Sequence, residues 1–248
     1  MLTILHRDRH LIAIDKPAGL LVHRSNLDRH ADRFAVQLLR DQIGAHVHPL
    51  HRLDRGTSGV LLFALDGASA AAVGRQFQDN QVRKRYLAVV RGWPPPAGLI
   101  DHALRPAPGE APAEAAAPPR PAQTAYRRLA TIELPVRVDR YPASRYALLA
   151  LEPRTGRTHQ LRRHLKHIAH PIIGDATHGK GAHNRYFRDH LGCARLLLAC
   201  TEIGISHPAT GERLTVACAP GDAFAAILDR FGWRDAAGVT AAPRRDAP

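Results

Sequence analysis

The sequence contains few cysteines and few lysines, and it has no long hydrophobic run. Its three cysteines, Cys193, Cys200 and Cys218, show neither metal-ligand spacing nor the pattern of a disulfide framework. We therefore expect a protein of the reducing cytoplasm. The apolar run at the N-terminus is too short for a signal peptide, and no stretch approaches the roughly 20 apolar residues of a membrane span.

Sequence signatures of cofactor binding are absent as well. We find no Walker A loop and no dinucleotide-binding fingerprint, so a nucleotide cofactor is not expected. The chain has 16 histidines, and His159, His164, His167 and His170 lie close together in sequence. The spacing of His164 and His167 brings only two ligands together, and no acidic or cysteine partner lies at ligand spacing. We therefore expect no metal site and no cofactor.

Arginine is the residue type that the chain has in excess. Only four of the 35 Lys and Arg residues are lysines, the formal net charge is +13 and the isoelectric point is about 10.7. A guanidinium group binds phosphate with two hydrogen bonds and stacks on bases, which an ammonium group does not do. The composition favours a polyanionic partner, nucleic acid ahead of a membrane surface. The alternative is a generally basic surface without a specific partner.

The run His51-Arg52-Leu53-Asp54-Arg55-Gly56-Thr57-Ser58-Gly59 places one carboxylate between two guanidinium groups. A short apolar run, 60–65, follows it and predicts a buried strand. An acid in this position is expected to stay ionised at neutral pH, and it adjoins groups that bind phosphate. Asp54 is therefore a candidate nucleophile or base acting on nucleic acid. The alternative is a surface ion pair followed by an ordinary turn.

Apolar periodicity predicts a chain in which strands dominate and helices are interspersed. The predicted strands cover 2–5, 11–14, 20–22, 60–65, 85–92, 124–134, 146–151, 196–199 and 214–216. The predicted helices cover 34–43, 68–79, 159–169 and 223–231. This pattern favours an α+β fold with a mostly antiparallel sheet.

Composition also indicates the domain organisation. The length of the chain fits one large domain or two small ones, and we expect a single domain over 1–234. The Pro/Ala-rich stretch 94–123 predicts a loop insertion, because its residues 107–121 offer little that could be buried. The final segment, 235–248, is predicted to be a disordered tail.

Three further stretches carry chemically useful side chains: Lys84-Arg85-Tyr86, the run from Thr155 to His164, and Arg195-Leu196-Leu197-Leu198. Tyr86 is suited to stack on a base, and the alternative is an ordinary strand tyrosine at the edge of the core. Arg162, on a predicted helix, is suited to pair with Asp54, and the alternative is a solvated arginine. The turn at Gly156 would present backbone N–H groups at a helix start, where a phosphate binds.

These motifs, in this order, resemble those of the RluA-type pseudouridine synthases. The resemblance rests on His51–Gly59 and Thr155–His164, and it extends to Asp15–Gly19 and His170–Asp175. It covers about 2–233. Details of the branch that modifies tRNA recur at 21–25, 40–44, 90–93, 140–142 and 231–234. One departure is that Ala199 and Cys200 stand where many members have histidine and alanine.

The resemblance implies a pseudouridine synthase fold, in which a mostly antiparallel, mixed and bent sheet is flanked by helices. It also implies isomerisation of a uridine to pseudouridine without metal or cofactor. It implies that the substrate is tRNA, at uridine 65 in standard tRNA numbering. No membrane association and no obligate protein partner are inferred. The alternatives are a ribosomal RNA enzyme of the same family, a non-catalytic RNA-binding protein on this scaffold, and a metal-dependent nuclease that uses the histidines.

The resemblance also assigns roles to individual residues. Asp54 is implied to be the catalytic aspartate, Arg162 its ion-pair partner, and Tyr86 the residue that stacks on the flipped uracil. Arg52 is implied to fill the gap that the flipped base leaves, and Leu197 or Leu198 to pack against the uracil. The further candidates for RNA contact in these motifs are His51, Arg55, Lys84, Arg157 and His159.

Overall fold

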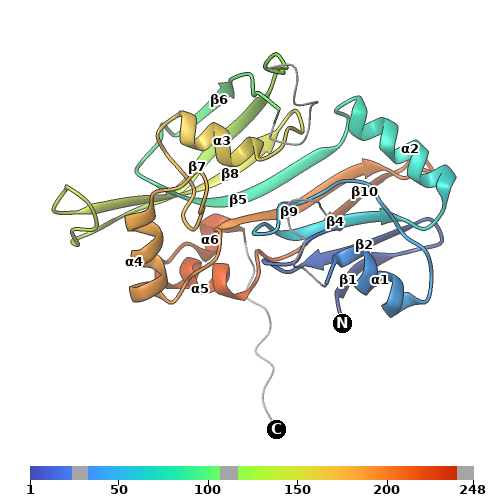
Figure 1. Cartoon of the computed structure of the whole chain (residues 1–248), viewed down its shortest axis with the longest axis horizontal. Coiled ribbons are helices and arrows are strands. Elements are labelled where there is room, and N and C mark those ends of the chain that lie inside the picture. The colour runs from blue at the N-terminus through green and yellow to red at the C-terminus, as the bar shows by residue number, and fades with distance from the viewer. Residues whose placement is uncertain (24–32, 107–116, 239–248) are drawn as a thin grey trace, which may run out of the picture.

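A computed structural model describes residues 1–23, 33–106 and 117–238. Within them, ten strands form one sheet in the order β1-β2-β4-β9-β5-β8-β7-β6, with β3 paired to β4 and β10 paired to β9 (Figure 1). The strands are β1 (Thr3–Arg7), β2 (Leu11–Lys16), β3 (His48–Pro49), β4 (Ser58–Ala64), β5 (Arg83–Arg91), β6 (Ala97–Asp101), β7 (Gln123–Leu134), β8 (Ser144–Pro153), β9 (Leu198–Ser206) and β10 (Arg213–Ala217). Strands β4 and β9 are parallel, and the other pairs are antiparallel. The predicted α+β class is confirmed.

Helices cover both faces of this sheet. They are α1 (Ala35–Ile43), α2 (Gly67–Gln78), α3 (Gln160–His167), α4 (Gly181–Leu191), α5 (Asp222–Arg230) and α6 (Arg234–Ala237). One apolar core contains side chains of α1, α2 and α3, and a second contains side chains of α4 and α5. Figure 1 shows α3 above the sheet and α4, α5 and α6 below it. Because both faces are covered, central strands must be apolar throughout, and every residue of β4 is buried.

Local signals explain where the predicted helices begin and end. The carboxylate of Asp66 accepts a hydrogen bond from the backbone N–H of Ser69 at 2.8 Å and so caps the start of α2. Helix α1 ends at Gly44, which adopts a left-handed conformation with φ of 66°. The helices predicted over 34–43 and 68–79 are therefore confirmed.

Two expectations about loops and strands were wrong. Residues 20–22 form no strand, only an isolated bridge between Leu21 and Phe34, because the carbonyl of Leu20 accepts a hydrogen bond from the Lys16 ammonium instead of pairing in the sheet. The predicted loop 94–123 contains β6, which pairs with β7 and buries Ile100. Its residues 107–116 lie outside the described part of the chain.

Two helical segments were not predicted. Helix α4 buries only His183 and Phe187, and two buried positions in a polar segment do not give a recognisable helical periodicity. Helix α6 includes the first residues of the expected tail, because the chain continues past Trp233, which is buried in the second core. The rest of that tail, 239–248, lies outside the described residues.

Gly59 allows the parallel strands β4 and β9 to approach closely. Its φ is 110°, and a Cβ at this position would lie 2.0 Å from the carbonyl oxygen of Cys200. Only glycine fits such an approach. The Ser58-Gly59 pair is therefore part of a strand rather than a turn, and it fixes the strand that follows the Asp54 loop against β9.

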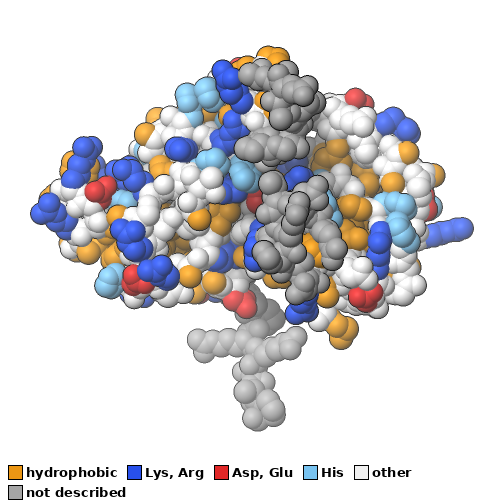
Figure 2. Space-filling model, viewed as in Figure 1, with side chains coloured by type: hydrophobic (Ala, Val, Ile, Leu, Met, Phe, Trp, Pro, Cys, Tyr) orange, Lys and Arg blue, Asp and Glu red, His pale blue; other side chains and the backbone are white. Residues whose placement is uncertain are grey.

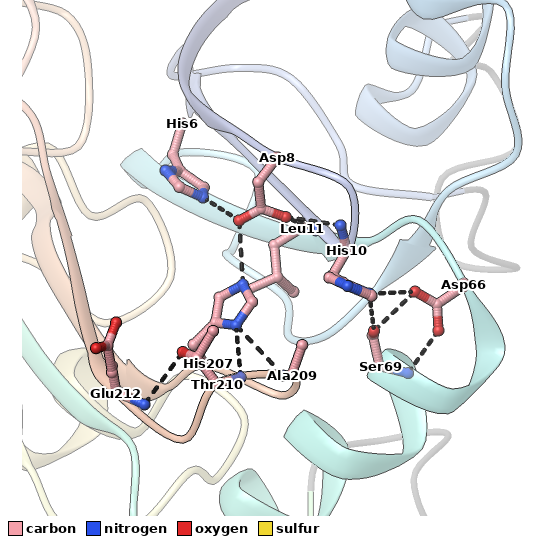
Figure 3. A network of polar contacts seen from close by, with 10 residues as sticks. All are labelled: His6, Asp8, His10, Leu11, Asp66, Ser69, His207, Ala209, Thr210 and Glu212. Carbon is pink, nitrogen blue, oxygen red and sulfur yellow. Dashed lines mark hydrogen bonds and ion pairs between the residues drawn. The ribbon is translucent and has the colours of Figure 1, made fainter.

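A polar network fastens the β1–β2 turn to the β9–β10 turn (Figure 3). Asp8 accepts hydrogen bonds from the backbone N–H groups of His10 and Leu11 at 2.6 and 2.7 Å. The rings of His6 and His207 lie 2.6 and 3.2 Å from its other oxygen. Burial alone would raise the pKa of Asp8, but these hydrogen bonds outweigh burial and hold the pKa far below its ordinary value.

We expect Asp8→Asn to lower the free energy of unfolding by about 1–2 kcal/mol at pH 7, because charged hydrogen-bond acceptors contribute more than neutral ones. A carboxyl with a depressed pKa in the folded state stabilises above its unfolded pKa, and this contribution disappears as the pH falls. The difference between the two proteins should thus be constant above about pH 5 and shrink below about pH 4. Urea unfolding between pH 7 and pH 3 measures it, and a difference that does not change with pH would contradict this role.

Candidate active site

A cavity of about 400 Å³ lies where separated stretches of sequence converge. Its walls come from the loop before β4, from β5, from the turn that enters α3, and from the start of β9. The structure therefore brings together Asp54, Tyr86, Arg162 and Leu198, which the sequence analysis proposed as candidate site residues.

The loop between β3 and β4 holds Asp54 at the cavity. The backbone N–H of Thr57 donates to the carbonyl of Asp54 at 3.0 Å, which closes a turn. Leu53 is buried in the first core, and a Cβ on Gly56 would lie 3.1 Å from the Cβ of Leu196. These anchors leave the Asp54 side chain 19% exposed, so that a ligand in the cavity can reach its carboxylate.

Lys16 ties this loop to the end of β2, a role that sequence reasoning missed. Its buried ammonium donates to the carbonyls of Pro17 and Leu20 at 2.9 and 2.8 Å and approaches that of Arg55 at 3.4 Å. Burial, followed by repulsion from Arg195, lowers the pKa of Lys16 to about 7. The Lys-Pro dipeptide was visible in the sequence, but no pattern indicated that its lysine is buried against the Asp54 loop.

Arg162 binds two carboxylates at once. Its Nη1 donates to Oδ2 of Asp54 at 3.0 Å, which confirms the predicted ion pair. Its Nε and Nη2 donate to the two oxygens of Asp175 at 2.8 and 2.9 Å. This two-point contact fixes the plane of the guanidinium group and hence the direction in which it meets Asp54.

Asp175 was not predicted as a site residue, although it closes the stretch from His170 to Asp175. Its side chain is fully buried, and Oδ1 also accepts from the backbone N–H groups of Thr177 and His178 at 2.9 and 2.8 Å. Burial alone would raise the pKa of Asp175, but the hydrogen bonds from Arg162 and His178 keep it below its ordinary value. The carboxylate therefore stays charged and keeps Arg162 in place.

Tyr86 lies in β5 beside the cavity and is 9% exposed. The strand departs from regular register with β9 at this residue, where Tyr86 faces Cys200. Burial, with the neighbouring Cys200 thiol, raises the pKa of Tyr86 well above its ordinary value. Its hydroxyl is therefore protonated at neutral pH, and its ring offers a flat wall to a planar ligand.

Cationic side chains surround the cavity. Arg52 is exposed, and Lys84 is half-buried, with its pKa lowered by burial. Arg157 is exposed as well, and its Nε donates to the carbonyl of Pro121 at 3.2 Å. These three predicted RNA-contact residues all line the cavity, where they favour an anionic ligand.

His159 also lines the cavity, at the start of α3. It adopts a left-handed conformation with φ of 53°, which is rare outside glycine and is retained where the surroundings impose it. Its Nε2 lies 3.9 Å from Oδ1 of Asp54, and its Nδ1 lies 3.3 Å from Nε2 of His178. Burial lowers the pKa of His159, so the ring is neutral near pH 7.

Two predicted RNA contacts, His51 and Arg55, make hydrogen bonds within the protein. His51 lines the cavity, but its Nε2 accepts the backbone N–H of Leu62 at 3.1 Å and its ring stacks on Phe77. Burial lowers the pKa of His51 to about 4, so the imidazole ring is neutral when it makes these contacts. The Nε of Arg55 donates to the carbonyl of Gly19 at 3.2 Å, on the side of the loop away from the cavity.

Leu197 was wrongly proposed as a contact for the substrate. Successive residues of an extended segment point to opposite faces. Leu198 therefore lines the cavity, whereas Leu197 is completely buried in the second core with Phe187 and Phe224.

Among residues 1–23, 33–106 and 117–238, no group of three or more His, Cys, Asp or Glu side chains is placed to hold a metal ion. The clustered histidines have other contacts: His164 bonds to Thr124 and to the His102 carbonyl, and His167 stacks on His102. No helix in the described part of the chain is long and apolar enough to cross a membrane.

Comparison with known proteins extends these observations. The sequence model of the family described as RNA pseudouridylate synthase matches residues 10–167. Proteins named tRNA pseudouridine synthase C are similar over almost the whole chain. The one from Vibrio cholerae is 46% identical over 95% of this chain and 98% of its own length. Those from Yersinia pestis and Salmonella typhi are 46% and 45% identical, over 94% and 99% of this chain and 92% and 98% of theirs.

Two solved human structures share the fold. Human RNA Pseudouridylate Synthase Domain Containing 4 superimposes with a TM-score of 0.69 at 25% identity, over 93% of both chains. Human RNA Pseudouridylate Synthase Domain Containing 1 gives a TM-score of 0.67 at 27% identity, over 88% of this chain and 83% of its own. The sheet and its flanking helices are thus common to proteins of widely different sequence.

Proposed function

Because the chain belongs to the family of RluA-type RNA pseudouridylate synthases, we propose that it isomerises a uridine of tRNA to pseudouridine, at position 65. Relatives of 45–46% identity that carry a tRNA pseudouridine synthase name support tRNA as the substrate. The observation that carries the assignment is the Asp54 carboxylate at the cavity, paired at 3.0 Å with an arginine that a second, buried carboxylate holds.

The reaction breaks the bond between N1 of uracil and C1′ of ribose and forms a bond between C5 and C1′. The C5 proton leaves and N1 gains a proton, so atoms balance without oxidant or reductant. We propose Asp54 as the catalytic group that acts on the nucleotide once it has entered the cavity. The small exposed fraction of Asp54 supports this role, because a bound uridine would cover the carboxylate and exclude water from it.

A base in a stem must leave its stack before an enzyme can reach its glycosidic bond, at a cost of a few kcal/mol. The walls of the cavity are suited to offset that cost. Tyr86 and Leu198 present aromatic and aliphatic surfaces to the uracil. Arg52, exposed at the same cavity, is suited to fill the gap in the stem, and the other cationic side chains are suited to bind the backbone phosphates.

The test uses the purified protein, unmodified transcripts of tRNA and ribosomal RNA, and carbodiimide mapping of pseudouridine. We expect one new pseudouridine in tRNA at position 65, none when that uridine is replaced by cytidine, and the same product in the presence of a chelator. A product confined to ribosomal RNA would reassign the substrate. Binding without any product would instead support a non-catalytic RNA-binding protein.

A further inference from the structure

A second cavity adjoins the one that holds Asp54. It has a volume of about 250 Å³, and four arginines, Arg105, Arg120, Arg157 and Arg163, contribute to its lining. The two cavities share the turn 156–158 as a common wall. A linear polymer bound in the first cavity would therefore reach the second cavity by passing over this turn.

Elements distant in sequence assemble the second cavity. Leu104 and Arg120 exchange two backbone hydrogen bonds of 2.9 Å, which sets the segments that carry Arg105 and Arg120 side by side. Arg163 comes from α3, directly after Arg162. A Cβ on Gly156 would meet nothing within 4 Å, so the backbone of the shared wall is open to a ligand.

Backbone carbonyls, rather than carboxylates, hold two of these arginines, Arg157 and Arg163. The Nη1 of Arg163 donates to the carbonyl of Arg105 at 2.8 Å, and the Nε of Arg157 donates to that of Pro121 at 3.2 Å. Among the described residues, none of the four makes a salt bridge, whereas Arg145, Arg188 and Arg234 each pair with an acid.

A neutral carbonyl orients a guanidinium group and leaves its charge in place. No acidic residue of the described chain contributes to the lining of this cavity. On the face of the molecule that Figure 2 draws, Lys and Arg side chains are more common than Asp and Glu side chains. Within the described residues, the lining therefore concentrates positive charge and presents guanidinium N–H groups, which can bind the several oxygens of a phosphate group.

We propose that this cavity binds a backbone phosphodiester of the RNA strand that carries the target uridine, and so sets which nucleotide enters the catalytic cavity. The inference rests on the proposed function and deepens it, since it assigns a binding site to the RNA strand next to the target uridine. Arg105 and Arg163 lie in this cavity but do not line the catalytic one, so they act on binding rather than on the reacting atoms.

The test compares the wild-type protein with the double variant Arg105→Gln/Arg163→Gln on full-length tRNA transcript. We expect KM to rise about tenfold at moderate salt with kcat within twofold, because lost phosphate contacts weaken binding without changing the chemistry. The slope of log KM against log salt concentration should fall by about 1 for each arginine removed. Ethylation of single tRNA phosphates should interfere with wild-type binding at one position that no longer matters for the variant.

The matched control is Arg185→Gln/Arg230→Gln, which removes the same charge from exposed positions on α4 and α5, across the sheet from α3. Its KM and salt slope should stay near those of the wild type. An unchanged KM and salt slope in Arg105→Gln/Arg163→Gln, or an equal rise in the control, would overturn the inference while wild-type activity still supports the proposed function. Absence of wild-type activity on every tRNA would instead refute the proposed function itself.

Discussion

Asp54→Asn is expected to lower kcat for pseudouridine formation by more than about 10³-fold, because the amide can neither attack carbon nor take a proton as a carboxylate does. Binding of tRNA should stay within about threefold of the wild type, or tighten slightly, since the substitution removes a negative charge that faces a polyanion. Arg162 keeps its two bonds to Asp175, so the site should retain its shape. Single-turnover assays and filter binding measure the two effects separately.

The matched control is Asp189→Asn, which removes one carboxylate from an exposed position on α4. It should have wild-type kcat, and both variants should unfold near the wild-type urea midpoint. Asp54→Asn with more than a tenth of wild-type kcat would refute the role proposed for Asp54. A parallel loss of RNA binding would mean that Asp54 shapes the site instead of serving the reaction.

Much of the fold could be predicted from the sequence because its periodicities are strong. The run 60–65, most of which lies in β4, is apolar throughout, and Asp66 caps the start of α2. Prediction failed where tertiary contacts override local signals. The apolar run 20–22 is not a strand because Lys16 takes the Leu20 carbonyl, and no local pattern shows that a lysine four residues away is buried.

The candidate site was predictable to the extent that its residues lie in dense motifs. Asp54, Tyr86 and Arg162 stand in three such runs, and the structure brings them to one cavity from a loop, a strand and a helix. The face to which a side chain points was harder to assign, as the pair Leu197 and Leu198 shows. A one-residue uncertainty in the start of β9 exchanges the cavity for the second core.

Residues that act through another residue leave the weakest sequence signal. Of the predicted site residues, Asp175 forms hydrogen bonds to Arg162 alone. In the sequence it follows a glycine after a short apolar segment, as many acidic residues in loops do. Its importance comes from full burial and from the number of donors around it, which only the three-dimensional structure shows. This arrangement leads to the second large effect that we expect.

Asp175→Asn should lower kcat by about 10–100-fold with KM within about threefold. Without the second charge, Arg162 loses its two-point ionic anchor, and a misplacement of about 1 Å in a catalytic site is enough for such a loss. The same change should lower the free energy of unfolding at pH 7 by about 3 kcal/mol, because it leaves a buried charge less well paired. Since the pKa of Asp175 is depressed in the folded protein, this stability difference should disappear as the pH falls below about 4.

Two comparisons separate positioning from mere stabilisation. Asp66→Ala removes the cap of α2, away from the cavity, and should cost about 1 kcal/mol of stability with kcat unchanged. In a double-mutant cycle, Asp175→Asn should add little to the loss that Arg162→Lys already causes, because both act through the same guanidinium group. Two results would show that Asp175 stabilises the chain without positioning Arg162. One is a loss of kcat in the double variant equal to the sum of the two single losses, expressed as free energies. The other is a kcat of Asp175→Asn that equals the wild-type value when it is calculated per folded molecule.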